Sequence, residues 1–193
     1  MPIEPFAIRV QRPDGSPVAG VEVQVAPTTA PLKPRRNGVV VEDVVTLMTD
    51  AMGLAQADLV TGQLTVRVGD IPAVTVDHRG GPVPPLLPAV TVTGMLRKVN
   101  GTASDKPVTF EPQFEPLVEG VLVMPESVTT QPEDGLITIK LIPGQYVVRH
   151  AGGRPGLVDV PGDWLTENFG APASWGGSGA TWGGMPLTWG VAA

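Results

Sequence analysis

Residues 49–68, TDAMGLAQADLVTGQLTVRV, and residues 131–150, QPEDGLITIKLIPGQYVVRH, share one pattern. Gly53 and Gly62 of the first stretch recur 82 residues later as Gly135 and Gly144. Apolar and polar residues alternate with a period of two in LTVRV of the first stretch and in ITIKL of the second, and Tyr146 and Val148 form a further stretch. This alternation of β-branched and other apolar residues, bounded by glycine and proline, predicts half-buried β-strands.

The segments upstream of these stretches also resemble each other. Residues 12–27 read RPDGSPVAGVEVQVAP, and residues 92–112 read VTGMLRKVNGTASDKPVTFEP. A Pro-rich excursion follows the first segment, and a Pro/Glu-rich excursion follows the second. A repeat of this length indicates a diverged domain duplication rather than a solenoid.

The fold class follows from the density of turns. The chain contains 24 glycines and 22 prolines among 193 residues, which leaves little room for long helices. The one helical candidate, residues 39–48, is rich in valine and favours a strand. We expect an all-β protein of two tandem small immunoglobulin-like antiparallel sandwiches. The predicted domains are residues 1–78, a Pro-rich linker at 79–89, a second sandwich at 90–160 and an extended Gly/Trp-rich tail at 161–193.

Composition excludes several classes of function. The formal net charge is -6, and the one basic cluster, Lys33-Pro34-Arg35-Arg36, is too short to neutralise a nucleic-acid backbone. Cysteine is absent, so disulfides and thiolate chemistry are not available. The N-terminus lacks the basic and apolar regions of a signal peptide, and no apolar run is long enough to cross a bilayer. We therefore expect synthesis in a cytoplasm, with no nucleic-acid or membrane partner.

Residues of both repeats carry a resemblance to known families. The pattern DG-x-PVAGV-x-V-x-V, followed by TDA-x-G-x-A and L-x-x-G-x-L-x-V, resembles the carboxypeptidase-regulatory or transthyretin-like branch of immunoglobulin-like sandwiches. The second repeat is similar to domains of tail and other virion proteins from bacteriophages that infect actinobacteria. The resemblance covers residues 5–160 and implies a structural role in a virion.

The chain offers little for catalysis or metal binding. Its two histidines, His78 and His150, lie one in each repeat, and Asp77 beside His78 would point to the opposite face of a strand. We interpret both as histidines at a strand edge or turn. No spacing of acidic residues matches a calcium loop. We predict no catalytic residue, no bound metal and no cofactor.

The C-terminal segment raises a different possibility. A Ser/Thr-Trp-Gly unit recurs at Trp175, Trp182 and Trp189, seven residues apart, and Trp164 lies upstream. Glycines beside each tryptophan and Pro186 within the run exclude a coiled-coil heptad. Exposed tryptophan is a liability unless it binds something. We therefore predict partner-binding tryptophans at positions 164, 175, 182 and 189, although a low-complexity tail that only caps its own sandwich remains an alternative.

These observations favour a non-enzymatic bacteriophage virion protein, located in the particle and bound to other virion proteins and sister copies. Within that class, a minor tail protein is preferred to a head decoration or capsid accessory protein. A host-surface carbohydrate-binding module is the alternative from another class, since tryptophan also stacks on sugars.

Overall fold

The fold is all-β, as the turn density predicts. The computed structural model describes residues 3–28, 44–98, 100–150 and 155–160, and the backbone of 181–182, 185–186 and 189–191. Within these ranges every regular element is a β-strand. The valine-rich candidate at 39–48 is a strand where it is described, because β3 spans Val45–Met48, and residues 39–43 lie outside the described part.

The chain divides into two compact units whose segments interleave along the sequence. Unit 1 comprises Met1–Arg12, Ser16–Leu86 and Pro116–Met124, and unit 2 comprises Pro13–Gly15, Leu87–Glu115 and Pro125–Ala193. The residues predicted as a linker, 79–89, contain no strand. Arg9 of unit 1 donates a hydrogen bond from Nε to the Pro84 carbonyl at 2.9 Å, so the first part of this segment is fastened to unit 1.

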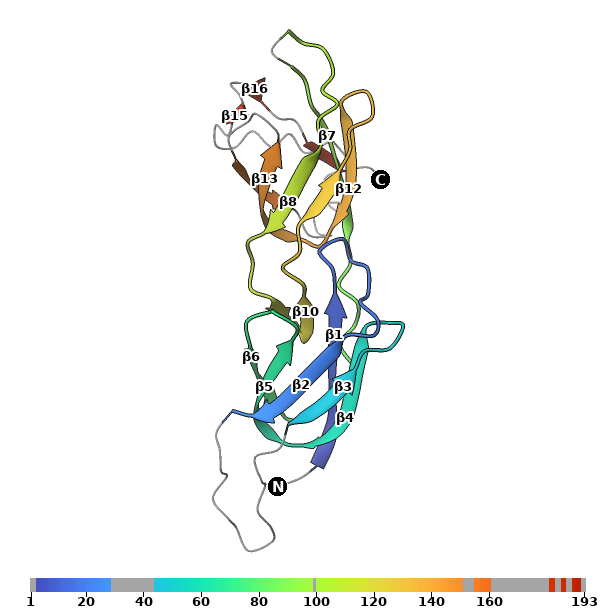
Figure 1. The fold of residues 1–193 in the computed structure, drawn as a ribbon, viewed down its shortest axis with the longest axis vertical. Coiled ribbons are helices and arrows are strands. Elements are labelled where there is room, and N and C mark those ends of the chain that lie inside the picture. Colours follow the sequence, from blue (N-terminus) through green and yellow to red (C-terminus); the bar gives the residue numbers. More distant parts are fainter. Residues whose placement is uncertain are drawn as a thin grey trace, which may run out of the picture. The chain divides into compact units, whose positions relative to one another are not determined.

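Unit 1 is sandwich-like, with two four-stranded sheets around one apolar core (Figure 1). One sheet has the order β4-β1-β10-β9 and the other the order β3-β2-β5-β6. Buried residues from both sheets form the core, among them Ile8, Val23, Val66 and Leu122. The strands other than β3 are β1 (Ile3–Gln11), β2 (Glu22–Pro27), β4 (Leu54–Val60), β5 (Gly62–Val68), β6 (Val74–His78), β9 (Leu117–Val118) and β10 (Val121–Val123).

Unit 2 has the same plan. One sheet has the order β11-β8-β13-β14, and the other has the order β12-β7-β17. Phe110, Ile137, Leu141 and Tyr146 lie in its core, all of them fully buried. The strands are β7 (Val90–Met95), β8 (Val108–Pro112), β11 (Val128–Thr130), β12 (Leu136–Leu141), β13 (Gly144–His150), β14 (Gly156–Val160) and β17 (Trp189–Val191), and a two-stranded sheet pairs β15 (Thr181–Trp182) with β16 (Met185–Pro186).

Backbone hydrogen bonds show that the two units repeat one fold. The Val10 amide donates to the Gly53 carbonyl at 2.7 Å, and the Leu96 amide donates to the Gly135 carbonyl at 2.7 Å. A side chain at either glycine would collide with the carbonyl oxygen of Val10 or Leu96, and both glycines have positive φ angles. The glycines that mark the repeat in sequence are therefore required by this close approach. The strand β1 corresponds to β7, β4 to β12, β2 to β8 and β5 to β13.

The expected boundary of the second domain needs one correction. The prediction assigned residues 90–160 to the second sandwich, but Pro116–Met124 belongs to unit 1. Its strand β10 pairs in parallel with β1, with Arg9 opposite Val121 and Gln11 opposite Val123. The three residues of β10 are at most 2% exposed. The segment belongs to unit 1, although its sequence neighbours belong to unit 2, because its apolar side chains are buried there.

Tyr146 fixes the core of unit 2. Its ring makes edge-on contacts with Phe110 and Phe114, at centroid distances of 6.5 Å and 5.5 Å. Its hydroxyl donates to the carbonyl of Ile142, four residues upstream, at 2.8 Å. Burial raises the pKa of this hydroxyl, so Tyr146 stays neutral and keeps its donor. Because the hydroxyl of Tyr146 has a hydrogen-bond acceptor, the whole side chain can be buried without an unpaired polar group.

Candidate functional site

Of the four tryptophans predicted to bind partners, the structure describes the backbone of two. Trp164 and Trp175 lie outside the described residues. Trp182 belongs to β15 and stands opposite Met185 of β16 in an antiparallel pair. Trp189 begins β17, which pairs antiparallel with β7 of unit 2. The last Trp-Gly repeat therefore adds its backbone to a sheet edge of the chain's own second unit.

The register of β17 on β7 is specific. Trp189 stands opposite Gly94, Gly190 opposite Thr93 and Val191 opposite Val92. The described backbone of the last Trp-Gly repeat therefore pairs with one particular stretch of β7.

Unit 1 also has a strand on the corresponding edge of its sheet, although β10 pairs in parallel with β1 whereas β17 pairs antiparallel with β7. There β10 pairs with β1 on the side away from β4, as β17 pairs with β7 on the side away from β12. We call this side of β1 and of β7 the acceptor edge. In both units a segment from outside the core repeat fills it. An edge strand presents free backbone amides and carbonyls, so added strands bind it through main-chain hydrogen bonds.

The acceptor edges of the two units differ in their side chains. In unit 1, Arg9 is 8% exposed and its guanidinium donates to the carbonyls of Pro84 and Met52. In unit 2 the corresponding residue is Met95, which is 41% exposed. A buried guanidinium needs such partners, because an unpaired charge in the interior is costly. In unit 1 the buried side chain at this position therefore has hydrogen-bond partners, whereas in unit 2 the side chain at the same position is apolar and exposed.

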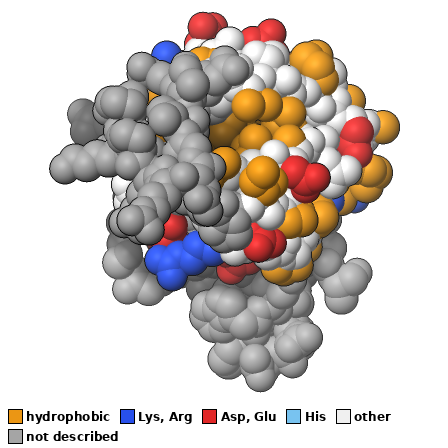
Figure 2. Space-filling view, turned by 90° about the horizontal axis from the view of Figure 1, so that it is seen from below, with side chains coloured by type: hydrophobic (Ala, Val, Ile, Leu, Met, Phe, Trp, Pro, Cys, Tyr) orange, Lys and Arg blue, Asp and Glu red, His pale blue; other side chains and the backbone are white. Residues whose placement is uncertain are grey.

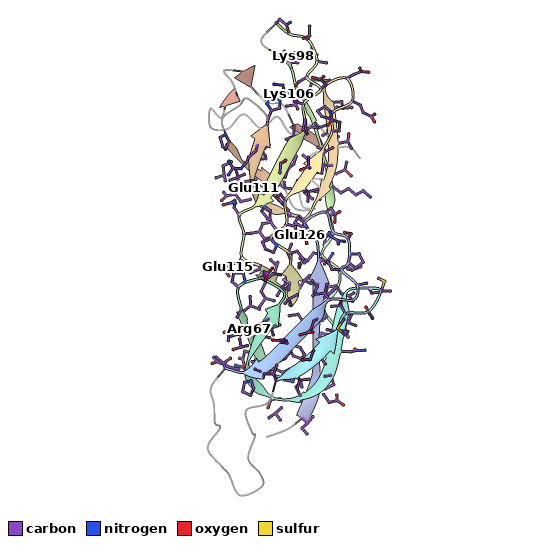
Figure 3. All side chains as sticks on the ribbon, in the orientation of Figure 1. Arg67, Lys98, Lys106, Glu111, Glu115 and Glu126 are labelled. Carbon is purple, nitrogen blue, oxygen red and sulfur yellow. The ribbon has the colours of Figure 1, made fainter. Side chains whose placement is uncertain are left out.

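One serine and one histidine come together in unit 2, which the sequence does not indicate. The Ser104 hydroxyl lies 3.4 Å from Nε2 of His150, at the end of β13. Burial lowers the pKa of His150, and the nearby positive charge of Lys106 lowers it further. Figure 3 places Lys98 and Lys106 at the same end of unit 2.

This pair does not resemble an activated nucleophile. Ser104 is only 3% exposed, so a substrate could not reach its hydroxyl. The same oxygen also accepts a hydrogen bond from the Lys106 amide at 3.5 Å. A nucleophilic serine needs an accessible oxygen beside a basic histidine, whereas this histidine is made less basic. The contact instead ties the loop at Ser104–Lys106 to the end of β13.

His78 lies at a sheet edge, as predicted, because it ends β6, the last strand of the sheet β3-β2-β5-β6. Its side chain is nevertheless buried, with 5% exposed. Its Nε2 lies 3.2 Å from the Glu4 carbonyl and 3.3 Å from the Leu59 carbonyl, and its Nδ1 accepts from the Gly80 amide. Its ring stands edge-on to Phe6 at 5.4 Å. The contacts of Nε2 link the end of β6 to strands β1 and β4.

Asp77, the sequence neighbour of His78, points to the other face, as the strand pattern predicts. It is exposed and forms an ion pair with Arg79 at 2.6 Å. The surface of the protein mixes such acidic side chains with apolar ones, as the face drawn in Figure 2 shows. Among the described residues of unit 1, the exposed large apolar side chains are Ile3, Val44, Met48, Met52, Val83 and Leu86.

Among the described residues, no group of three or more His, Cys, Asp or Glu side chains could hold a metal ion. The part of the chain that the structure describes also has no helix long and apolar enough to cross a membrane. No protein-family model, no curated protein and no solved structure matches this chain.

The strand that fills the acceptor edge of unit 1 was missed by the sequence analysis. Val121, Leu122 and Val123 were assigned to a Pro/Glu-rich excursion, but they fill that edge. The available signal was a continuous apolar run between Gly120 and Pro125. Such a run, bounded by turn residues, is typical of a strand buried on both faces.

Proposed function

We propose that this chain is a non-enzymatic structural protein of a bacteriophage particle, and a minor tail protein in preference to a head decoration protein. The observation that carries the proposal is the pairing of β17 with β7, because it joins a Trp-Gly repeat to a folded unit by strand addition. Strand addition is a general mode of assembly, in which main-chain hydrogen bonds give affinity and side-chain pockets give specificity. The virion assignment rests on the resemblance of the two repeats.

Each unit, in this proposal, is an immunoglobulin-like sandwich that serves as a rigid module. Two features support this finer fold assignment. In each unit two sheets share one core, and the Tyr146 hydroxyl bonds to the backbone four residues upstream, as in the tyrosine corner of such sandwiches. The remaining tryptophans of the tail act as anchors on neighbouring virion subunits, because buried aromatics dominate the binding energy of interfaces.

Mass spectrometry of purified phage particles tests the proposal. The expected result is a defined copy number of this chain per particle, together with its recovery in isolated tails. Absence from the particles would overturn the virion role. Binding of the isolated protein to host-surface glycans, with no particle association, would instead support a carbohydrate-binding module.

A further inference from the structure

The loop between β7 and β8 contains an Asn-Gly pair in a tight turn. Asn100 and Gly101 are exposed, and so are Lys98 and Thr102 on either side of them. The Lys98 amide donates to the Thr102 carbonyl at 2.7 Å, and the Gly101 amide donates to the Lys98 carbonyl at 2.8 Å. Gly101 has a φ of 81°, a conformation that glycine adopts without strain. These bonds place Asn100 and Gly101 near the centre of the turn.

The side chain of Asn100 is held by two hydrogen bonds from one residue. Its Oδ1 accepts from the Thr102 amide at 3.1 Å and from the Thr102 hydroxyl at 2.7 Å. Both donors draw electron density away from the side-chain carbonyl, so its carbon, Cγ, becomes more electrophilic. Donors at such distances also stabilise the negative charge that develops on a carbonyl oxygen when its carbon is attacked. The turn thus prepares the Asn100 side chain for nucleophilic attack.

We propose that Asn100 is a self-modification site, at which the backbone nitrogen of Gly101 attacks Cγ of Asn100. A bond forms from this nitrogen to Cγ, and the bond from Cγ to Nδ2 breaks. The Gly101 nitrogen gives up its proton and Nδ2 leaves as ammonia, which leaves a five-membered succinimide ring. Water then opens the ring at either carbonyl and gives aspartate or isoaspartate. Since both reacting groups belong to adjacent residues, the first step is intramolecular.

Gly101 makes this attack sterically possible. A side chain on the residue after asparagine would crowd the approaching nitrogen, and glycine has none. No atom beyond its chain neighbours lies within 4 Å of the position that a Cβ at Gly101 would take. The nitrogen must first leave the Lys98 carbonyl and lose its proton, and exposed backbone hydrogen bonds of this kind open readily. The reaction should therefore become faster as the pH rises.

The first repeat indicates that this turn accepts the product. The turn at Arg12–Ser16 is closed by the same type of bond, from the amide of its first residue to the carbonyl of its last, at 2.8 Å. Its Asp14-Gly15 pair stands in the place of Asn100-Gly101, and the φ angles of the two glycines are 84° and 81°. Aspartate at position 100 should therefore leave the fold intact. The reaction uses only groups of the folded chain, so it does not depend on the proposed role in a virion.

Peptide mapping by mass spectrometry tests the site. The purified protein is incubated at neutral and at mildly alkaline pH and then digested. The expected result is replacement of the Asn100 side-chain amide by a carboxylic acid, as a mixture of aspartate and isoaspartate, with faster conversion at the higher pH. The chain's other Asn-Gly pair, at positions 37–38, lies outside the described residues, so the two peptides are analysed separately.

Thr102→Val is the matched variant, because valine has nearly the same shape as threonine but no hydroxyl donor. It should slow conversion several-fold, whereas Thr102→Ser keeps the donor and should convert like the parent chain. Circular dichroism of each variant checks that it remains folded. An unmodified Asn100 in the folded chain would overturn the proposal, and so would equal rates in Thr102→Val and the parent chain.

Discussion

Val10 and Leu122 come from different halves of the chain, yet they stand opposite each other in neighbouring parallel strands, and both are fully buried. Leu122 lies in the core of unit 1 together with Phe6 and Ile8. Unit 1 is thus completed by a segment, Pro116–Met124, that follows the stretch Leu87–Glu115 of unit 2 in the sequence. The two strands are far apart in the sequence, so their pairing has a high entropic cost of loop closure. The burial of apolar surface must offset this cost.

Leu122→Ala should therefore destabilise unit 1, although the residue lies in the second half of the sequence. Loss of a fully buried leucine typically lowers the free energy of unfolding by about 2–5 kcal/mol. Hydrogen exchange with mass spectrometry should show faster exchange in β1 and β4 and little change in β8 and β13. Leu157→Ala is the control, because Leu157 is 55% exposed and its loss should be nearly silent. Faster exchange confined to unit 2 would contradict the assignment of β10 to unit 1.

His78 is expected to be structural. His78→Ala removes the edge-on contact with Phe6 and the donor that faces two backbone carbonyls. The combined loss of a buried ring and its hydrogen bonds should lower the free energy of unfolding by about 2–4 kcal/mol. His78→Gln should cost less, since its amide keeps a donor. Urea denaturation followed by circular dichroism measures the three proteins, and equal stability of His78→Ala and the unchanged chain would refute the role.

The titration of His150 follows from its surroundings. Desolvation, and then Lys106, lower its pKa below the ordinary value of 6.5. A histidine with a lowered folded-state pKa contributes its full stability above the unfolded pKa, and that contribution is lost as the pH falls through the folded pKa. The loss due to His150 should therefore begin near pH 6.5 and continue below it.

NMR titration of the His150 ring protons checks this expectation. The midpoint should lie below that of a model histidine, and Lys106→Gln should move it upward, because the substitution removes the repelling charge. Asp105→Asn is a useful control on the same loop, since Asp105 pairs with Lys98 at 3.7 Å rather than with His150. A midpoint unchanged by Lys106→Gln would mean that desolvation alone sets the pKa.

The sequence alone predicts the strands and the repeat, but it does not predict which strands pair with each other. Alternation in LTVRV and ITIKL predicts β5 and β12, because period two follows directly from strand geometry. The pairing of β10 with β1 is a long-range contact that local patterns do not encode. The two histidines differ in their strand neighbours, since His78 stands opposite Gly62 at the end of β6 and His150 opposite Val108 at the end of β13.

The acceptor edge was equally hidden from sequence reasoning. An edge is defined by which strands lie on either side of it, and this depends on sheet order rather than on any residue type. The pairing of β10 with β1, which follows the turn at Glu119-Gly120, becomes visible only in the structure.

Deletion of residues 171–193 tests the role of the C-terminal repeats. The described core of unit 2 is formed by side chains of β7, β8, β12, β13 and β14, so the shortened chain should remain folded. Hydrogen exchange should become faster in β7, because Val92–Gly94 lose the strand that pairs with them. Exchange in β8 and β13 should stay the same, and circular dichroism should remain that of a β-protein.

Incorporation into particles should nevertheless fail for the shortened chain. If the tryptophans anchor the protein, single Trp182→Ala should weaken docking by about 2–4 kcal/mol per copy, the range of an aromatic hot spot. Ser178→Ala serves as the control in the same segment and should be nearly silent. Copy number per particle, measured by quantitative mass spectrometry, is the readout. A shortened chain that enters particles at full copy number would refute the anchor role of the tail, and the two units themselves would then have to make the assembly contacts.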